Sequence, residues 1–99
     1  MISMIERKTK VTVIDFYADW CNPCQQIKPE YERIAQFYDE TKVSFCSCNV
    51  DRAKPCAQHF RVTSIPTFMV FYAGETISTV RGGELGQVQR QIDMAVGLL

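Results

Sequence analysis

Apolar and polar residues alternate along the chain in two periods, which divide it into strand-like and helix-like segments. Residues 10–17, 43–50 and 67–72 are rich in β-branched and aromatic residues, a composition typical of strands. Residues 76–81 predict a fourth strand, antiparallel to the third if the intervening turn, with Gly74 at positive φ, is a tight hairpin. The first strand is apolar on both faces, which predicts a central strand covered on both sides.

Helical periodicity fills most of the remaining chain. Apolar residues recur every three or four positions from residue 22 to about residue 40 and again from 84 to 99. Residues 54–60 predict a short helix that Asp51 can cap, and Pro29 predicts a kink inside the long helix. The order of elements predicts a mixed β-sheet flanked by helices, an α/β fold, and the length of 99 residues predicts a single domain.

Charge and cysteine content narrow the class of protein. Eleven Lys and Arg balance eleven Asp and Glu, so bulk electrostatics favour neither nucleic acid nor a membrane surface as a partner. No apolar run approaches the ~20 residues of a membrane helix, and residues 1–9 lack the apolar core of a secretion signal. Five cysteines, an odd number, argue against a fully paired secreted framework. We therefore expect a cytoplasmic protein, where a close cysteine pair is catalytic or binds a metal.

The cysteine pair of Trp20-Cys21-Asn22-Pro23-Cys24 lies where the first strand meets the long helix. Free N–H groups and the macrodipole at a helix N-terminus stabilise a thiolate and can lower a thiol pKa of ~8.5 to about 7, which favours Cys21 as the nucleophile. Cys24 lies one helical turn further, within bonding reach and deeper in the fold, as a resolving thiol requires. Asn22 and Pro23 fix the turn between them and are expected to tune the reduction potential.

Two alternatives stay open for these cysteines: an incidental pair, or half of a zinc site. Zinc needs two more ligands, and the available ones are Cys46, Cys48, Cys56 and His59. Cys46 and Cys48 lie in a predicted strand rather than a metal-binding knuckle, so we expect no metal. We expect these three cysteines to be small buried hydrophobes, with a regulatory or intermolecular disulfide as the alternative, and His59 to lie on the surface.

Several motifs in matching order resemble the thioredoxin family. VIDFYADWCNPC at 13–24 resembles the strand and helix start of its active site, and VTSIPTF at 62–68 resembles its cis-proline loop. Gly74-Glu75 and Gly82 stand where the family has its hairpin turn and its groove glycine. The resemblance covers residues 10–99 and implies a thioredoxin fold and a protein-disulfide reductase. It also implies disulfide-containing protein substrates, re-reduction by thioredoxin reductase, and no bound cofactor.

The resemblance also assigns roles to individual residues. Cys21 would attack a substrate disulfide, and Cys24 would then attack the sulfur of Cys21 and release the reduced substrate. The groove that receives the substrate chain would be lined by four residues: Trp20, Ile65, Pro66 and Gly82. Pro66 would follow a cis peptide bond and present the backbone of Ile65 for strand-like pairing.

Asp15 interrupts an otherwise apolar strand. By itself it is either a strand-end carboxylate turned to solvent or a buried base with a raised pKa that helps to deprotonate Cys24. The resemblance favours the buried base. Ser47 stands where many bacterial members carry a lysine near this aspartate, so we expect the pKa of Asp15 to exceed that in lysine-containing relatives. Asn22 stands where the commonest family motif has glycine. The resemblance therefore implies the reaction class but does not fix the reduction potential.

Residues 1–9 look like the family's first strand and the beginning of its first helix, most of which is missing. We expect a shortened edge that leaves the sheet intact, in a monomer or weak dimer; the alternative is a segment that pairs differently or with another molecule.

Two rival functions are a disulfide oxidase or isomerase on this fold and a non-catalytic binding module. Pro23 and the absence of a signal segment weigh against the first, and both cysteines with Asp15 against the second.

Overall fold

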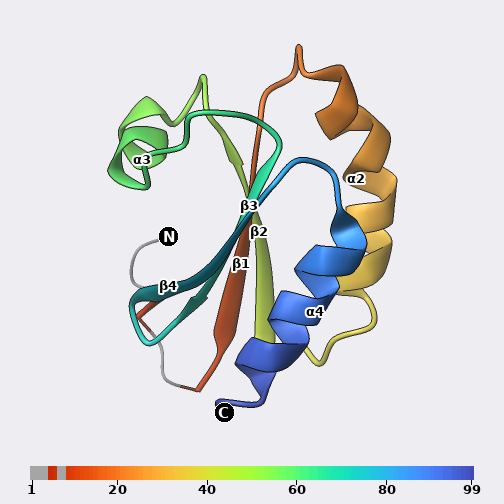
Figure 1. Ribbon diagram of the computed structural model, residues 1–99, viewed down its shortest axis with the longest axis vertical. Coiled ribbons are helices and arrows are strands. Elements are labelled where there is room, and N and C mark those ends of the chain that lie inside the picture. Colours follow the sequence, from red (N-terminus) through yellow and green to blue (C-terminus); the bar gives the residue numbers. More distant parts are fainter. Residues whose placement is uncertain (1–4, 7–8) are drawn as a thin grey trace.

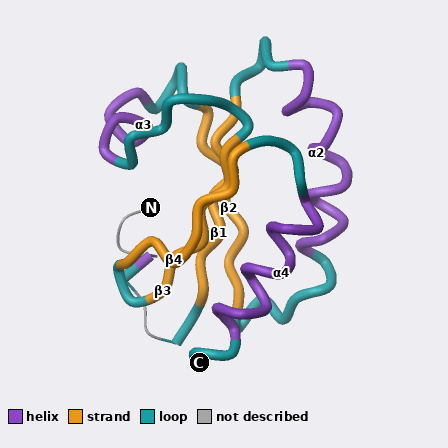
Figure 2. The backbone as a smooth tube through the Cα atoms, in the orientation of Figure 1, coloured by secondary structure: helices purple, strands orange, loops and turns teal. Residues whose placement is uncertain are grey.

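The computed structural model describes residues 5–6 and 9–99, and its strands form one sheet in the order β2-β1-β3-β4. β1 pairs parallel with β2 and antiparallel with β3, which pairs antiparallel with β4. α2 and α4 lie on one side of the sheet and α3 on the other (Figures 1 and 2). The predicted mixed sheet flanked by helices is therefore confirmed. In chain order the elements are β1 (Val11–Tyr17), α2 (Asn22–Ala35), β2 (Val43–Asn49), α3 (Lys54–His59), β3 (Thr67–Tyr72), β4 (Glu75–Arg81) and α4 (Leu85–Val96).

α2 ends at Ala35, five residues earlier than its periodicity predicts. Past the helix end Phe37 is 75% exposed, whereas Tyr38 still packs against the core, so the apolar periodicity outlasts the helix. The Asp39 carboxylate accepts hydrogen bonds from the N–H and the hydroxyl of Thr41, at 2.8 and 2.6 Å, and this local turn leads the chain into β2. The N–H groups of Gln36, Phe37 and Tyr38 donate to carbonyls three residues back rather than four, so the backbone tightens after Ala35 and the α-helix ends there. α2 runs through Pro29 without interruption.

β1 divides the core into two clusters, because successive side chains of a strand point to opposite faces. Val11 and Val13 pack under α2 and α4, whereas Ile14 and Phe16 pack on the side of α3. All four are fully buried, and each such side chain stabilises the fold by about 1.5–3 kcal/mol. Asp15 shares the parity of Val11 and Val13, so the strand directs its carboxyl group toward α2.

The turn between β3 and β4 is a tight hairpin, as the sequence predicts. Gly74 has φ of 85° and Ala73 has φ of 53°, the positive values that favour a twisted two-residue turn. The N–H of Gly74 donates to the carbonyl of Ile5 at 2.7 Å, and Ile5 is buried against the α3-side cluster. The expected shortening of the first helix concerns residues 1–9, of which 1–4 and 7–8 lie outside the described residues.

Candidate active site

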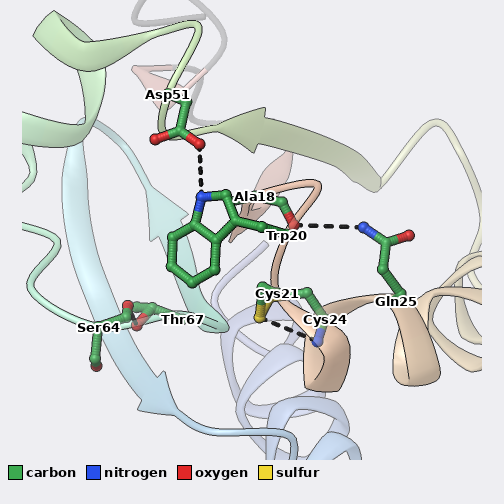
Figure 3. Close-up of a disulfide and its surroundings, with 8 residues drawn as sticks. All are labelled: Ala18, Trp20, Cys21, Cys24, Gln25, Asp51, Ser64 and Thr67. Carbon is green, nitrogen blue, oxygen red and sulfur yellow. Dashed lines mark hydrogen bonds between the residues drawn. A yellow bond between two sulfur atoms is a disulfide. The ribbon is translucent and has the colours of Figure 1, made fainter.

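Cys21 and Cys24 are joined by a disulfide at the N-terminus of α2, with their Cα atoms 5.3 Å apart. Cys21 is the N-cap: its backbone is extended, and its sulfur accepts the N–H of Cys24 at 3.2 Å (Figure 3). An N–H directed at this sulfur favours negative charge on it, so the position stabilises a Cys21 thiolate. Each cysteine is 4% exposed in the disulfide form, and the deeper position expected of Cys24 stays a prediction for the dithiol.

Asn22 and Pro23 form the first helical turn between the two cysteines, and both are exposed. Proline has no N–H to leave without a partner there, and its φ suits the helix start. Gln25 closes the turn from the other side, since its side-chain amide donates to the carbonyl of Ala18 at 3.4 Å. The redox pair is therefore held on a rigid frame.

Trp20 stands beside the disulfide with 69% of its surface exposed. Its indole N–H donates to the carboxylate of Asp51 at 2.8 Å, which orients the ring (Figure 3). The prediction that Asp51 caps the short helix is wrong: the N-cap of α3 is Ala53, with no side-chain hydrogen bond. Asp51 instead belongs to the site, a role that only the tertiary fold creates.

A groove runs from Trp20 along the loop before β3 and is lined by six residues: Trp20, Val50, Val62, Thr63, Ser64 and Ile65. The peptide bond between Ile65 and Pro66 is cis, as predicted. The N–H of Gly82 donates to the carbonyl of Pro66 at 2.9 Å, and Gly82 has φ of 96°, which disfavours any side chain. Of the four predicted groove residues, Trp20 and Ile65 line this groove, whereas Pro66 and Gly82 are not among its lining residues and are hydrogen-bonded to each other next to Ile65. Ile65 also packs against Cys21 and Cys24.

Asp15 lies behind the disulfide and is buried, with 5% of its surface exposed, so it is not a strand-end residue turned to solvent. Its Oδ1 has no hydrogen-bond partner among the described residues. Burial raises the pKa of Asp15 from 3.8 to about 7, partly offset by the positive charge of Lys28. A small cavity of about 40 Å³ joins this carboxyl group to Cys24 and is large enough for a water molecule.

Lys28 is a site residue that the sequence reasoning missed. Its ammonium group lies over the ring of Tyr17, 6.0 Å from the centroid, and its side chain lines the cavity of Asp15. Ser47 lines the same cavity from β2 and brings no charge. The cation near Asp15 therefore comes from the helix rather than the strand. Its position one turn after Cys24, on the same face of α2, was the available signal.

Lys28→Met is expected to raise the pKa of Asp15 above about 7, because a nearby positive charge that favours the carboxylate is removed. An increase of about 0.5 is expected for so exposed a cation. The carboxyl carbon of Asp15, followed by NMR against pH, measures it. Lys54→Met, on the far side of the sheet, is the control. An unchanged or lower pKa in Lys28→Met contradicts the assignment.

The remaining predicted residues lie away from the disulfide. His59 is exposed on α3, as predicted, and its ring packs edge-on against Phe60. Cys46, Cys48 and Cys56 contribute to the apolar cluster on the α3 side. Within the residues that the structure describes, no group of three or more His, Cys, Asp or Glu side chains is arranged to hold a metal ion.

A cysteine pair at a helix N-terminus, with a groove on one side and a buried carboxyl group behind it, can undergo thiol–disulfide exchange: its dithiol form reduces a disulfide, and its disulfide form oxidises a dithiol. Fold and site together define a thiol–disulfide oxidoreductase.

Comparison with known proteins gives the family. The sequence model of the thioredoxin family matches residues 2–94. Thioredoxin from Malassezia sympodialis is 40% identical over 83 residues, which cover 84% of this chain and 79% of that protein. Mitochondrial thioredoxin-2 from Schizosaccharomyces pombe is 38% identical over 76 residues, 77% of this chain and 56% of that protein. The crystal structure of the Malassezia thioredoxin has a TM-score of 0.86 at 35% identity, covering 95% of this chain and 82% of that one. The chain belongs to the thioredoxin family.

Proposed function

We propose that the chain works in the reducing direction, as a protein-disulfide reductase in which Cys21 is the nucleophile and Cys24 the resolving thiol. One observation carries this assignment: the sulfur of Cys21 caps α2 and accepts the N–H of Cys24. That hydrogen bond and the helix macrodipole favour a thiolate at Cys21 rather than at Cys24.

The reaction proceeds in two exchanges. The Cys21 thiolate attacks one sulfur of the substrate disulfide, forms a mixed disulfide and releases the first substrate thiolate. Cys24 then loses its proton, attacks the sulfur of Cys21 and releases the second substrate thiolate. The carboxylate of Asp15 accepts the proton of Cys24 through the cavity between them. A pKa of about 7 for Asp15 suits transfer in both directions near neutral pH.

The groove beside the disulfide receives the substrate chain. Trp20 and Ile65 offer apolar surface, and the backbone of Ile65, in the bend before Pro66, would offer its polar groups for strand-like pairing. Gly82, whose N–H donates to the carbonyl of Pro66, has no side chain. A Cβ there would meet no atom within 4 Å, so the space beside Gly82 is open. A substrate backbone can approach closely on that side. Asn22 and Pro23 act indirectly, by setting the stability of the disulfide relative to the dithiol.

The reduction potential tests the direction of the reaction. Equilibration with dithiothreitol buffers of known ratio is expected to give a value near about −270 mV, which is typical of reductases. A value at or above about −180 mV supports the alternative, an oxidase or isomerase on this fold. Insulin reduction in the presence of dithiothreitol tests the other alternative, because a non-catalytic binding module does not accelerate it.

The proposal extends to partners and location. Thioredoxin reductase would return electrons to the Cys21–Cys24 disulfide, and residues 1–99 would act as a single domain, in a monomer or weak dimer, in the cytoplasm. The two core clusters share one sheet, which supports the single domain. Among the described residues no helix is long and apolar enough to span a membrane. One relative is named as mitochondrial, so fractionation of the source cell is the test of location.

A further inference from the structure

Cys48 and Cys56 lie side by side on the face of the sheet that the redox site does not use. Cys48 belongs to β2 and is 2% exposed, whereas Cys56 belongs to α3 and is half-buried. Both pack in one apolar cluster with Phe16 and Met69, and their thiol groups are hydrogen-bonded to each other. Figure 1 shows α3 on the side of the sheet away from α2 and α4. Two neighbouring thiols on two different elements form a candidate covalent link.

We propose that Cys48 and Cys56 are a second redox site, which a disulfide of low molecular weight, such as glutathione disulfide, converts reversibly into a disulfide between β2 and α3. Only a small movement is required, from hydrogen-bonded contact to bonding distance. α3 can supply it, because this six-residue helix has no side-chain cap at its N-terminus and only one buried residue, Ala57. Cys46 lies two positions before Cys48, about 7 Å further along the strand.

The chemistry is two successive thiol–disulfide exchanges. The Cys56 thiolate attacks one sulfur of the glutathione disulfide, forms a mixed disulfide and releases one glutathione thiolate. The Cys48 thiolate then attacks the sulfur of Cys56, forms the Cys48–Cys56 bond and releases the second glutathione thiolate. Two protein thiols are oxidised and one external disulfide is reduced; the two thiolates released take up the two protons that the cysteines lose. Excess glutathione reverses both steps.

Exposure sets the order of the two steps. Cys56 is the more accessible thiol and meets the oxidant, whereas Cys48 is shielded beneath it. Burial raises the pKa of Cys48 to about 11, and the negative charge of Cys56 and the hydrogen bond to it contribute. Once Cys56 is held in a mixed disulfide its charge is gone, so part of this increase in the pKa of Cys48 is relieved. The resolving step is then favoured at the moment it is needed.

The link would restrain one wall of the substrate groove. It closes the chain between Cys48 and Cys56, which contains Val50 and Asp51. Val50 lines the groove, and Asp51 holds the indole of Trp20 at 2.8 Å. Oxidation on one face of the sheet is therefore transmitted to the surface beside the redox disulfide. This consequence rests on the proposed function, whereas formation of the link does not.

Peptide mapping tests the link directly. The full chain is equilibrated with glutathione buffers of increasing disulfide content, alkylated and cleaved with trypsin without reduction. Arg52 lies between the two cysteines, so cleavage leaves Cys48 and Cys56 in separate peptides unless a disulfide joins them. The expected result is a linked pair that appears at higher glutathione disulfide than Cys21–Cys24 does and disappears on addition of glutathione.

Three variants assign the bond. Cys46→Ser is the matched control, since Cys46 shares the tryptic peptide of Cys48, and the link is expected to form unchanged. Cys56→Ser is expected to abolish the link, and Cys48→Ala to accumulate glutathione on Cys56. Cys48 is buried, so Cys48→Ala can fail to fold. In that case the result for Cys56→Ser decides the test. The inference is overturned by a link that Cys46→Ser removes, by glutathione adducts without a link in the wild type, by dimers through Cys56, or by no reaction.

Hydrogen exchange provides the second readout. Amides between Cys48 and Cys56 are expected to exchange at least about threefold more slowly once the link has formed, while those of α4 are unchanged. Equal rates in both forms contradict the restraint of the groove wall. Neither measurement uses insulin reduction, so the failure of this inference and the failure of the proposed reductase function are recognised separately.

Discussion

Replacement of Cys21 by serine is expected to abolish the reduction of protein disulfides. A serine hydroxyl at the N-cap does not ionise near neutral pH, so no nucleophile remains to attack the substrate. The rate of insulin reduction with dithiothreitol is expected to fall by at least about 1,000-fold, to the uncatalysed background. Cys46→Ser is the matched control, because it changes a cysteine of β2 that lies outside the site, and its rate is expected to equal that of the wild type.

Cys24→Ser is expected to separate the two exchanges. Cys21 still attacks, but without the resolving thiol the mixed disulfide persists. Mass spectrometry after reaction with Ellman's reagent is expected to find a stable adduct on the peptide of Cys21. If this variant carries adducts only on its other cysteines, or if Cys21→Ser retains turnover, the order of the two cysteines is wrong.

Asp15→Asn is expected to make the protein more stable at high pH and to change its stability little at low pH. The carboxyl group has a pKa near 3.8 in the unfolded chain and about 7 in the folded protein. Between these values the folded state keeps a proton that the unfolded state has lost, so the free energy of unfolding falls as the pH rises. The full loss, about 4 kcal/mol, is reached above pH 7.

Urea denaturation at pH 4 and pH 8 measures this effect. The variant is expected to exceed the wild type by about 2–4 kcal/mol at pH 8 and by less than about 1 kcal/mol at pH 4. Asp19→Asn, which changes an exposed carboxylate that pairs with Arg52, is the control and is expected to show no such dependence on pH. A difference that is the same at both pH values contradicts the raised pKa.

Asp15→Asn is also expected to slow the second exchange near neutral pH, because an asparagine at this position cannot accept the proton of Cys24. The deficit is expected to be about tenfold at pH 7 and to shrink toward pH 9, where hydroxide deprotonates Cys24 without assistance. Rapid-mixing measurement of the resolving step gives the pH profile. An unchanged rate at pH 7 removes Asp15 from the mechanism.

The sequence predicted those features of the fold that depend on local pattern. The first strand, the hairpin at Gly74 and the positions of the cysteines at a helix start follow from periodicity and turn chemistry, and the structure agrees. Periodicity places the end of α2 too late, because Tyr38 still packs against the core after the helix has ended. The backbone there has already changed to bonds between residues three apart, which the apolar pattern does not register.

The partners of the site residues were harder to predict. Asp51 and Trp20 are far apart in sequence and meet only because β2 lies beside β1. The helical pattern could have placed Lys28 on the same face of α2 as Cys24. Its effect on the pKa of Asp15, however, depends on Asp15 lying beneath α2. Pair interactions between elements need the register of the sheet, which no single segment encodes.

The central position of β1 has a consequence for how the protein folds. β3 and β4 adjoin through a two-residue turn, whereas Asp15 pairs with Ser47 on one side and Phe68 on the other. Pairing β1 with β2 or with β3 closes a much longer stretch of chain than the hairpin turn does. It therefore costs more chain entropy, and we expect β1 to pair late. The cysteines follow β1, and the loop of Pro66 precedes β3. When the whole chain refolds, the β3–β4 hairpin is therefore expected to form before the cysteines and the loop of Pro66 come together, so the recovery of redox activity would report that folding is complete.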